Sequence, residues 1–154
     1  MTTTTPRRIP RLLARAPIAV FRLGLGGLFG GRLVMVDHRG RKSGLVRRVV
    51  LETVARDGAA RIVVSGYGWS SQWLRNIRAD PRVRLWAGWG TGRPARAAIL
   101  PSAEAIAVLE AYRQEHPGAA KALGRALRLD QLAEDGPLTT EQVEDLPVVR
   151  IAPR

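Results

Sequence analysis

Two apolar runs separated by a basic, glycine-containing segment constrain the fold of this chain more than any other feature. Residues 33–36 precede the segment and residues 49–54 follow it, and both runs have the β-branched character of strands. The segment between them, residues 37–48, is rich in Arg and also contains Gly40 and Gly44, which can adopt the positive φ values that a tight turn often needs. We therefore predict a β-hairpin with a concentration of cations at one end.

The cations of this turn have two interpretations. Ser43 and the backbone N–H groups can donate hydrogen bonds to an anion, and Arg41 and Lys42 can neutralise its charge. The turn would then bind a phosphate or a polyanionic tail. The alternative is a solvated basic hairpin, and the turn alone does not decide between the two.

The positive charge of the chain lies in the part that contains this hairpin. Residues 1–100 hold 19 Lys and Arg against 4 Asp and Glu, a net charge of +15, whereas residues 101–154 hold 6 against 9, a net charge of −3. Candidate partners are nucleic acid, an anionic membrane or an anionic small molecule. The chain has no Cys, which excludes thiolate chemistry, and its two histidines, His38 and His116, are too few for a histidine-rich metal site.

The rest of the pattern predicts a single α+β domain over residues 1–154. Besides residues 33–36, strands are expected at residues 47–55, 61–65, 82–86, 94–100 and 147–151. Helices are expected up to about residue 79 (capped by Ser70 or Ser71), at residues 103–115 (capped by Ser102) and at 118–129, with a helical turn at 140–146. Short links favour antiparallel pairing, and six strands that close on themselves form a small barrel with helices packed outside.

Residues 1–31 are expected to form a tail and a basic amphipathic helix, in which Pro17 predicts a kink or restart. This helix is expected to cover one side of the sheet or to lie on an anionic membrane surface, and the two roles are compatible. Residues 18–29 are apolar but too short to span a bilayer, and they contain Arg22. Without a signal-peptide pattern, we expect a cytoplasmic protein, with peripheral contact to the inner face of the membrane as the alternative.

No group of side chains has the pattern of a hydrolase. Asp37 and His38 are neighbours on a strand, so their side chains point to opposite faces and cannot form a dyad, and we expect His38 to be structural. A cofactor would then carry any chemistry. Residues 66–81 combine a glycine loop with a helix start, where free N–H groups can bind an anion or a heterocycle. Trp73 and Asn76 share a face of that helix. Both side chains could lie beside such a ligand. Alternatively, Trp73 belongs to the core and Asn76 makes a hydrogen bond at the helix end.

Together the two segments resemble the deazaflavin-dependent nitroreductase family. The residues that carry the resemblance are Gly40-Arg41-Lys42-Ser43-Gly44-x-x-Arg47, then Ser65-Gly66, then Trp73-x-x-Asn76-Ile77-x-Ala79-x-Pro81. Members of this family are small proteins that use coenzyme F420. The resemblance implies a six-stranded antiparallel split β-barrel with flanking helices and an N-terminal helix.

The resemblance also implies roles for individual residues. F420 carries a phosphate and an oligoglutamate tail. In the family, residues of the basic turn bind these two groups, and the matching residues here are Arg41, Lys42, Ser43, Gly44 and Arg47. Ser65 and Gly66 match positions that hold the deazaflavin ring, and Trp73 and Asn76 match the helix motif beside the cofactor. The substrate-side candidates are Tyr67, Trp69 and Tyr112.

The implied activity is hydride transfer from reduced F420 to a small hydrophobic acceptor of the quinone, nitroaromatic or enone type, by a monomer or homodimer. The resemblance requires no protein acid for the hydride step, and we expect no metal. Two alternatives remain, an FMN-binding split barrel and a basic nucleic-acid-binding barrel without enzymatic activity. Nucleic acid is not expected, because no aromatic platform accompanies the basic turn.

Overall fold

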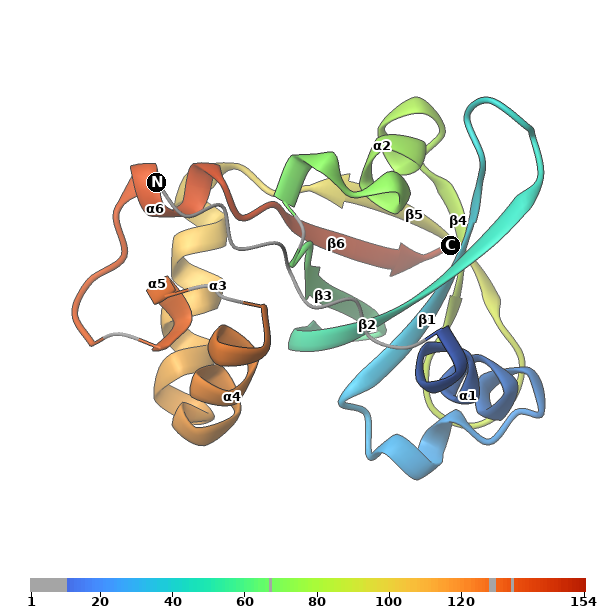
Figure 1. Ribbon diagram of the computed structural model, residues 1–154, viewed down its shortest axis with the longest axis horizontal. Coiled ribbons are helices and arrows are strands. Elements are labelled where there is room, and N and C mark those ends of the chain that lie inside the picture. Colours follow the sequence, from blue (N-terminus) through green and yellow to red (C-terminus); the bar gives the residue numbers. More distant parts are fainter. Residues whose placement is uncertain (1–10, 67, 128–129, 134) are drawn as a thin grey trace.

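The computed structural model describes residues 11–66, 68–127, 130–133 and 135–154, and its centre is a closed β-barrel (Figure 1). The strands are β1 (Leu33–Arg39), β2 (Val46–Asp57), β3 (Ala60–Val64), β4 (Arg82–Trp86), β5 (Arg93–Ile99) and β6 (Val148–Pro153). Their order around the barrel is β1-β2-β3-β6-β5-β4, and all neighbours are antiparallel. The predicted fold class, an α+β six-stranded antiparallel split barrel, is confirmed.

The hairpin of β1 and β2 is longer than the sequence predicted. β1 continues to Arg39, which pairs with Val46, so the turn contains only residues 40–45. The prediction of a turn over residues 37–48 was wrong because strand pairing uses backbone groups, and exposed charged side chains do not interrupt it. Gly44 has the predicted positive φ, +71°, but Gly40 does not. Gly40 instead provides space, since a Cβ atom there would lie 2.6 Å from Oγ of Ser43.

The helices lie around the barrel, with α3 to α6 at its left, α2 at its top and α1 at its lower right in Figure 1. They are α1 (Arg11–Arg22), α2 (Gln72–Ala79), α3 (Ser102–Glu115), α4 (Pro117–Leu127), α5 (Asp130–Ala133) and α6 (Thr140–Glu144), with short 3₁₀ helices η1 (Gly26–Phe29) and η2 (Gly68–Ser70). None of the helices among the described residues is long and apolar enough to cross a membrane.

Several local predictions about helices need correction. α1 continues through Pro17, so the restart that the sequence allowed there does not occur. Pro101, not Ser102, is the N-cap of α3, since its extended conformation already turns the chain into the helix. Ser71 does precede α2, but its side chain makes no capping hydrogen bond. The predicted tail, the helix start at residues 6–10 and the helix end at 128–129 lie outside the described residues, as do the side chains of residues 11–16.

Two apolar clusters stabilise this arrangement. The first fills the barrel, and α2 contributes Trp73, Leu74 and Ile77 to it, so that α2 is anchored firmly at one end of the barrel. The second lies between the sheet and α3, α4 and α6. β3 is buried on both faces, because Val63 belongs to the first cluster and its neighbours Ile62 and Val64 to the second.

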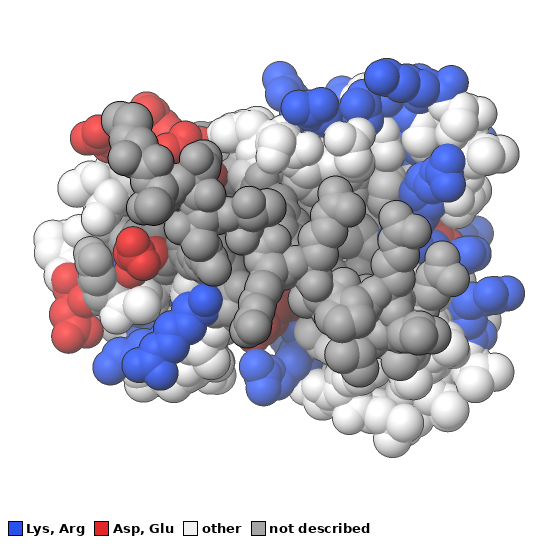
Figure 2. Space-filling model, in the orientation of Figure 1, with Lys and Arg blue, Asp and Glu red and all other residues white. Residues whose placement is uncertain are grey.

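Charge separates along the molecule (Figure 2). Acidic side chains gather at the end that carries α5 and α6, where a basic group also lies over α4, and basic side chains line the end that carries α2 and the β1–β2 hairpin. The uneven charge of the sequence is therefore also uneven in space. An anionic ligand would be attracted to the hairpin end of the barrel.

Candidate functional site

A groove of about 610 Å³ lies between the β1–β2 hairpin and the start of α2. Its lining includes six of the residues predicted from the sequence: Arg41, Lys42, Ser43, Arg47, Trp73 and Asn76. The basic turn and the helix motif, which are separate in the sequence, therefore meet at one place. The groove is the candidate functional site.

Arg41 fastens the turn to α2. Its backbone N–H and its Nη1 both donate to Oδ1 of Asn76, at 3.1 and 2.9 Å. Its Nη1 and Nη2 also donate to Oε1 of Gln72, each at 3.0 Å. The guanidinium group of Arg41 is thus bound by two uncharged side chains, which leaves its positive charge uncompensated but fixes its position.

His38 completes this network from β1. Nδ2 of Asn76 lies 3.1 Å from Nδ1 of His38, whose side chain is only 5% exposed. Burial lowers the pKa of His38 to about 4, with Asp37 opposing the shift and Arg47 adding to it. At neutral pH the imidazole is therefore uncharged, and its Nδ1 accepts the hydrogen bond from Asn76.

His38 and Asp37 do not face each other, as expected for neighbours on a strand. Asp37 instead accepts a hydrogen bond from Nε1 of Trp86 at 3.1 Å, and Nε of Arg48 lies 3.1 Å from its Oδ1. Asp37 and Arg48 are cross-strand partners in the ladder of β1 and β2. The structural role predicted for His38 agrees with these contacts.

The other cations of the hairpin differ in whether they already have partners. Arg48 pairs with Asp37, and Nη1 of Arg39 donates to the carbonyl of Gly44 at 3.0 Å. Within the described part of the chain, the Lys42 and Arg47 side chains have neither an ion-pair nor a hydrogen-bond partner. Both are exposed at the groove. They are the charged groups most available to an anion.

The remaining predicted cofactor residues lie outside the lining of the groove. Gly44 forms the tip of the turn, where its N–H donates to the carbonyl of Gly40 at 2.8 Å. Ser65 is fully buried at the end of β3, and its Oγ donates to the carbonyl of Gly68 at 2.9 Å. Gly66 follows it directly. The structure therefore brings the predicted tail-binding residues and the helix motif together, but not the predicted ring-binding pair.

The substrate-side candidates are dispersed. Trp69 is 41% exposed, with Nε1 donating to the carbonyl of Glu144 at 2.6 Å and the guanidinium of Arg78 5.4 Å from its ring. Tyr112 is buried on α3 and lines a different pocket, and Tyr67 lies outside the described residues. Among the described residues, the groove is thus not lined by the aromatic side chains named for the substrate.

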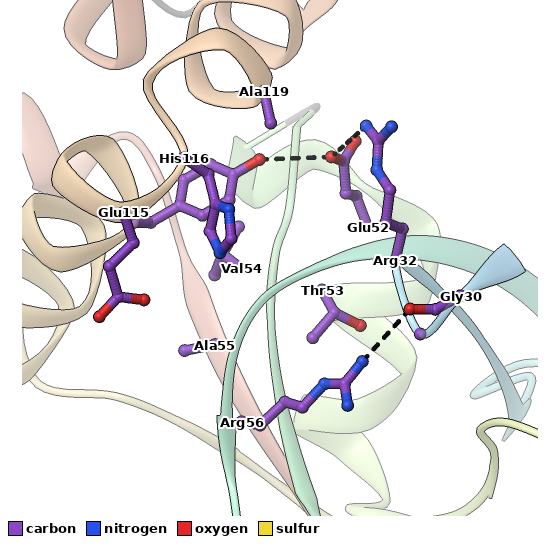
Figure 3. A pocket seen from close by; sticks show the side chains of 12 residues that line it. Gly30, Arg32, Glu52, Thr53, Val54, Ala55, Arg56, Glu115, His116 and Ala119 are labelled. Atoms are coloured by element: carbon purple, nitrogen blue, oxygen red, sulfur yellow. Dashed lines mark hydrogen bonds and ion pairs between the residues drawn. The ribbon is translucent and has the colours of Figure 1, made fainter.

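The pocket beside Tyr112 has a volume of about 530 Å³ and lies between the end of β2 and α3 (Figure 3). The Tyr112 hydroxyl donates to Oε1 of Glu52 at 3.3 Å, and Nη2 of Arg32 lies 3.1 Å from the same oxygen. Burial, and then the negative charge of Glu52, raise the pKa of Tyr112 to about 12. Tyr112 is therefore a hydrogen-bond donor at any ordinary pH.

Sequence reasoning missed some residues of the groove. Those that line it without having been assigned a ligand role are His38, Gly40, Arg48, Val49, Ser71 and Gln72. A helical signal for Gln72 was present, because it precedes Asn76 by one turn and shares its face. Nothing local indicates His38, which reaches the site only through the pairing of distant segments.

Comparisons with known proteins bear on the fold and on the family. The chain matches the family model described as F420H(2)-dependent quinone reductase over residues 19–127. The solved structures with similar folds include the following three. The first structure is described as an F420-H2 dependent reductase and is 21% identical to this chain, with a TM-score of 0.50. The match covers 78% of this chain and 93% of that structure's chain. One described as a domain-swapped dimer is also 21% identical, with a TM-score of 0.54 and coverages of 93% and 99%.

The third structure is a heme storage protein from Vibrio cholerae, which is 12% identical, with a TM-score of 0.55 and coverages of 92% and 90%. No curated protein matches the chain significantly. At these identities the structural likenesses establish the barrel fold alone. The family match rests on the sequence, and it includes both the basic turn and the helix motif.

Proposed function

The chain belongs to the F420H(2)-dependent quinone reductase family and is an oxidoreductase that uses coenzyme F420, and on this premise we propose that it transfers a hydride from the reduced deazaflavin to a hydrophobic, quinone-like acceptor. Nitroaromatic and enone compounds are further acceptors of the same electronic type. The observation that carries the proposal is the groove in which Lys42 and Arg47, which have no partner among the described residues, present their charges beside Arg41.

The donor set of the groove fits the cofactor. F420 bears a phosphate and an oligoglutamate tail, so its binding site needs fixed positive charge and hydrogen-bond donors. Lys42 and Arg47 would hold the tail carboxylates or the phosphate through charge-assisted hydrogen bonds. Ser43 has a hydroxyl whose oxygen accepts from the N–H of Leu45 at 3.2 Å, so its proton remains available to an anion. Gly44 would let the backbone approach closely.

Arg41 has a different proposed role from its neighbours. Because its guanidinium is bound to Gln72 and Asn76, it orients the turn and adds its charge to the groove from a fixed position. We assign Trp73 and Asn76 to the wall of the groove, and Ser65 and Gly66 to the end of β3 where the deazaflavin ring is held. These assignments rest on the residues that match the family motif.

A peripheral membrane contact would bring the protein to quinone-like acceptors. Apolar side chains are strongly exposed around α1, η1 and the β4–β5 link, including Leu23 (74%), Leu28 (67%) and Trp89 (65%). The N–H of Gly90 donates to the carbonyl of Gly24 at 2.9 Å, which joins the two segments. An exposed Trp with neighbouring Leu residues is typical of side chains that enter a membrane interface.

The oligomeric state is part of the same proposal. We propose a single F420-binding domain that acts as a monomer or homodimer. The homodimer is favoured by one observation, namely that a similar structure is described as a domain-swapped dimer. Light scattering of the purified protein distinguishes the two states.

The decisive experiment compares F420 and FMN. Quenching of tryptophan fluorescence is expected to show tight binding of F420 that weakens with added salt, because the ligand is polyanionic. With F420H2 and menadione, the absorbance of oxidised F420 should then increase at a rate that depends on the protein. Preferential binding of FMN, or tight salt-sensitive binding of DNA or RNA without F420 binding, would contradict the proposal.

Membrane contact is tested by liposome cosedimentation. Leu23→Asp and Leu28→Asp should each lower the fraction that pellets with anionic vesicles, because a charge then enters the proposed contact. Ala107→Asp is the matched control, since it adds the same charge to an exposed position on α3. Equal pelleting of all three variants would remove this surface from the proposal without affecting the assignment of the groove.

A further inference from the structure

The loop between β3 and α2, residues 65–71, joins the sheet to the groove, and its described part excludes residue 67. Ser65 at its start is fully buried, and Ser71 at its end lines the groove. The loop lies beside the segment that leads from α6 into β6 (Figure 1), where the N–H of Ser65 donates to the carbonyl of Pro147 at 2.9 Å. The start of the loop is therefore fixed to the barrel.

Hydrogen bonds within the loop couple its two ends. The Oγ of Ser65 donates to the carbonyl of Gly68 at 2.9 Å, and the N–H of Gly68 donates back to the carbonyl of Ser65 at 2.9 Å. The N–H of Ser71 donates to the same carbonyl of Gly68 at 3.3 Å. Gly68 has a φ of +63°, which this tight turn requires. A displacement of Gly68 would therefore shift both the buried end and the groove end of the loop.

Trp69 fastens the loop to α6. Its Nε1 donates to the carbonyl of Glu144, the last residue of that helix, at 2.6 Å. The two backbones approach closely here, since a Cβ atom at Gly68 would lie 3.3 Å from the carbonyl oxygen of Asp145. α6 is a firm support, because Thr139 closes a capping box at its start. The indole N–H thus ties the loop to a fixed point outside the groove.

Directed contacts on two sides, more than burial, hold the indole of Trp69. The guanidinium of Arg78 on α2 lies 5.4 Å from the centre of the ring, which is a cation–π contact. The residue is nevertheless 41% exposed. Trp69 therefore connects the loop both to α6 and to α2, the helix whose start forms one wall of the groove.

We propose that Trp69 is a positioning residue for hydride transfer. This inference rests on the proposed function, which assigns the deazaflavin ring to Ser65 and Gly66 and the anionic tail to Lys42 and Arg47. The tail contacts belong to the basic turn and do not depend on the loop, whereas the place of the ring does. A misplacement of reacting groups by about 1 Å lowers a rate by about a hundredfold. By fixing the loop, Trp69 fixes the ring relative to the acceptor.

Trp69→Phe tests the tether in the full-length protein. Phe keeps an aromatic ring beside Arg78 but has no N–H donor for the carbonyl of Glu144. With F420H2 and menadione, kcat should fall about fivefold to tenfold, the effect of losing roughly one hydrogen bond. The KM for menadione should stay unchanged. The dissociation constant of F420, measured by the fluorescence anisotropy of the cofactor, should also stay unchanged, because the charged contacts of the tail remain.

Amide hydrogen exchange gives a second measurement that does not depend on turnover. In the protein without cofactor, peptides that cover residues 65–71 should exchange faster in Trp69→Phe than in the wild type, because the loop has lost its tether. Trp86→Phe is the matched control. It also removes one indole hydrogen bond, from Nε1 to Asp37 at 3.1 Å, but on a strand that pairs with β1 and β5. The control should leave both kcat and exchange of the loop unchanged.

The outcomes separate this inference from the proposed function. A wild-type protein that neither binds F420 nor reduces menadione would overturn both. Unchanged kcat in Trp69→Phe, an equal loss in Trp86→Phe, or a loss without faster exchange of the loop would overturn the tether alone. A raised KM for menadione at unchanged kcat would instead assign Trp69 to the acceptor.

Arg78→Gln decides the matter if Trp69→Phe does not fold. This variant removes the cation from the ring of Trp69 and keeps the indole N–H. Because an exposed cation–π contact contributes about 0.5–1 kcal/mol, kcat should fall about twofold to fivefold, again with unchanged affinity for F420. An unchanged kcat in Arg78→Gln would then count against the positioning role.

Discussion

The Nδ2 atom of Asn76 lies 3.1 Å from the Nδ1 atom of His38, in a buried contact that joins α2 to β1. The other end of the same amide accepts two hydrogen bonds from Arg41. The amide can adopt only one orientation, because its donor must face the neutral imidazole and its acceptor must face the N–H groups of Arg41. Asn76 therefore sets the distance between the basic turn and the helix.

Replacing Asn76 with Leu should destabilise the protein and weaken F420 binding. The variant leaves the backbone N–H of Arg41 and Nδ1 of His38 without these partners, and the loss at the buried His38 costs about 1–3 kcal/mol. Urea unfolding followed by circular dichroism measures the change. Gln72→Leu is the control, because it removes only exposed contacts with Arg41, and it should cost less than about 1 kcal/mol. Equal losses for the two variants would contradict the central role of Asn76.

The stability of the protein should decline on mild acidification because of His38. Its pKa is about 4 in the folded state, against the ordinary value of 6.5, so the unfolded chain binds more protons between these values. The free energy of unfolding should therefore fall as the pH drops from about 6.5 towards 4 and level off below that, by up to about 3 kcal/mol. Chemical unfolding at a series of pH values measures this.

His38→Gln provides the comparison for that experiment. Gln carries an uncharged acceptor and does not titrate, so the difference in stability between wild type and variant should shrink, or change sign, as the pH falls through this range. Carboxylates contribute equally to both proteins and cancel. A difference that stays constant from pH 7 to about 4 would show that His38 is not the responsible group.

Lys42 and Arg47 should contribute more to salt-sensitive F420 binding than other exposed cations. Lys42→Met and Arg47→Met should each weaken binding by about 1.5–3 kcal/mol if the residue contacts the anionic tail, and each should reduce the dependence on salt. Fluorescence titration at several salt concentrations measures both quantities. Arg125→Gln on α4 is a control for net charge alone and should change the affinity little. An equal effect of all three substitutions would indicate long-range attraction rather than contact.

The sequence predicted the barrel well because its strands are marked by local signals. Alternating or continuous apolar runs separated by Gly and Pro identify each strand, and short links restrict their pairing. The family resemblance includes both the basic turn and the helix motif, so it also predicted that Lys42 and Asn76 lie at one site. The extension of β1 to Arg39 was missed because charged side chains on an exposed hairpin resemble a turn when only their chemistry is considered.

The functions of individual charges were not predictable from the sequence. Arg41, Arg47 and Arg48 have identical chemistry, and only the fold shows that Arg48 pairs with Asp37 and that Arg41 binds Asn76. The pocket at Tyr112 was also missed, since it requires residues from β2, α3 and the segment before β1 to meet. Such contacts between distant segments have no local pattern.

Tyr112 should titrate unusually late. Its pKa of about 12 means that the hydroxyl stays protonated when an ordinary tyrosine has ionised at about 10. Because the folded state holds its proton more tightly than the unfolded chain, the stabilising contribution of Tyr112 is complete below pH 10 and is lost as the pH rises towards 12. Ultraviolet difference spectra follow the ionisation, and chemical unfolding follows the stability.

Tyr112→Phe separates the hydroxyl from the ring. The variant keeps the buried ring but removes the donor to Glu52, so the free energy of unfolding at neutral pH should fall by about 0.5–1.5 kcal/mol. The late ionisation should disappear from its spectra. Persistence of a late-titrating tyrosine in the variant would assign that behaviour to the other tyrosine of the chain.

The β1–β4 ladder is the shortest of the barrel, by one residue pair, and this seam has a consequence for how the chain folds. β1 pairs with β2 along its whole length, but it pairs with β4 only through Met35, Val36 and Asp37, opposite Trp86, Leu85 and Arg84. This seam joins segments far apart in the sequence, so its formation carries a large loss of chain entropy for few hydrogen bonds. Closure at this seam should come late in folding, after the hairpins have formed, and native-state hydrogen exchange should proceed faster there than across the β1–β2 ladder.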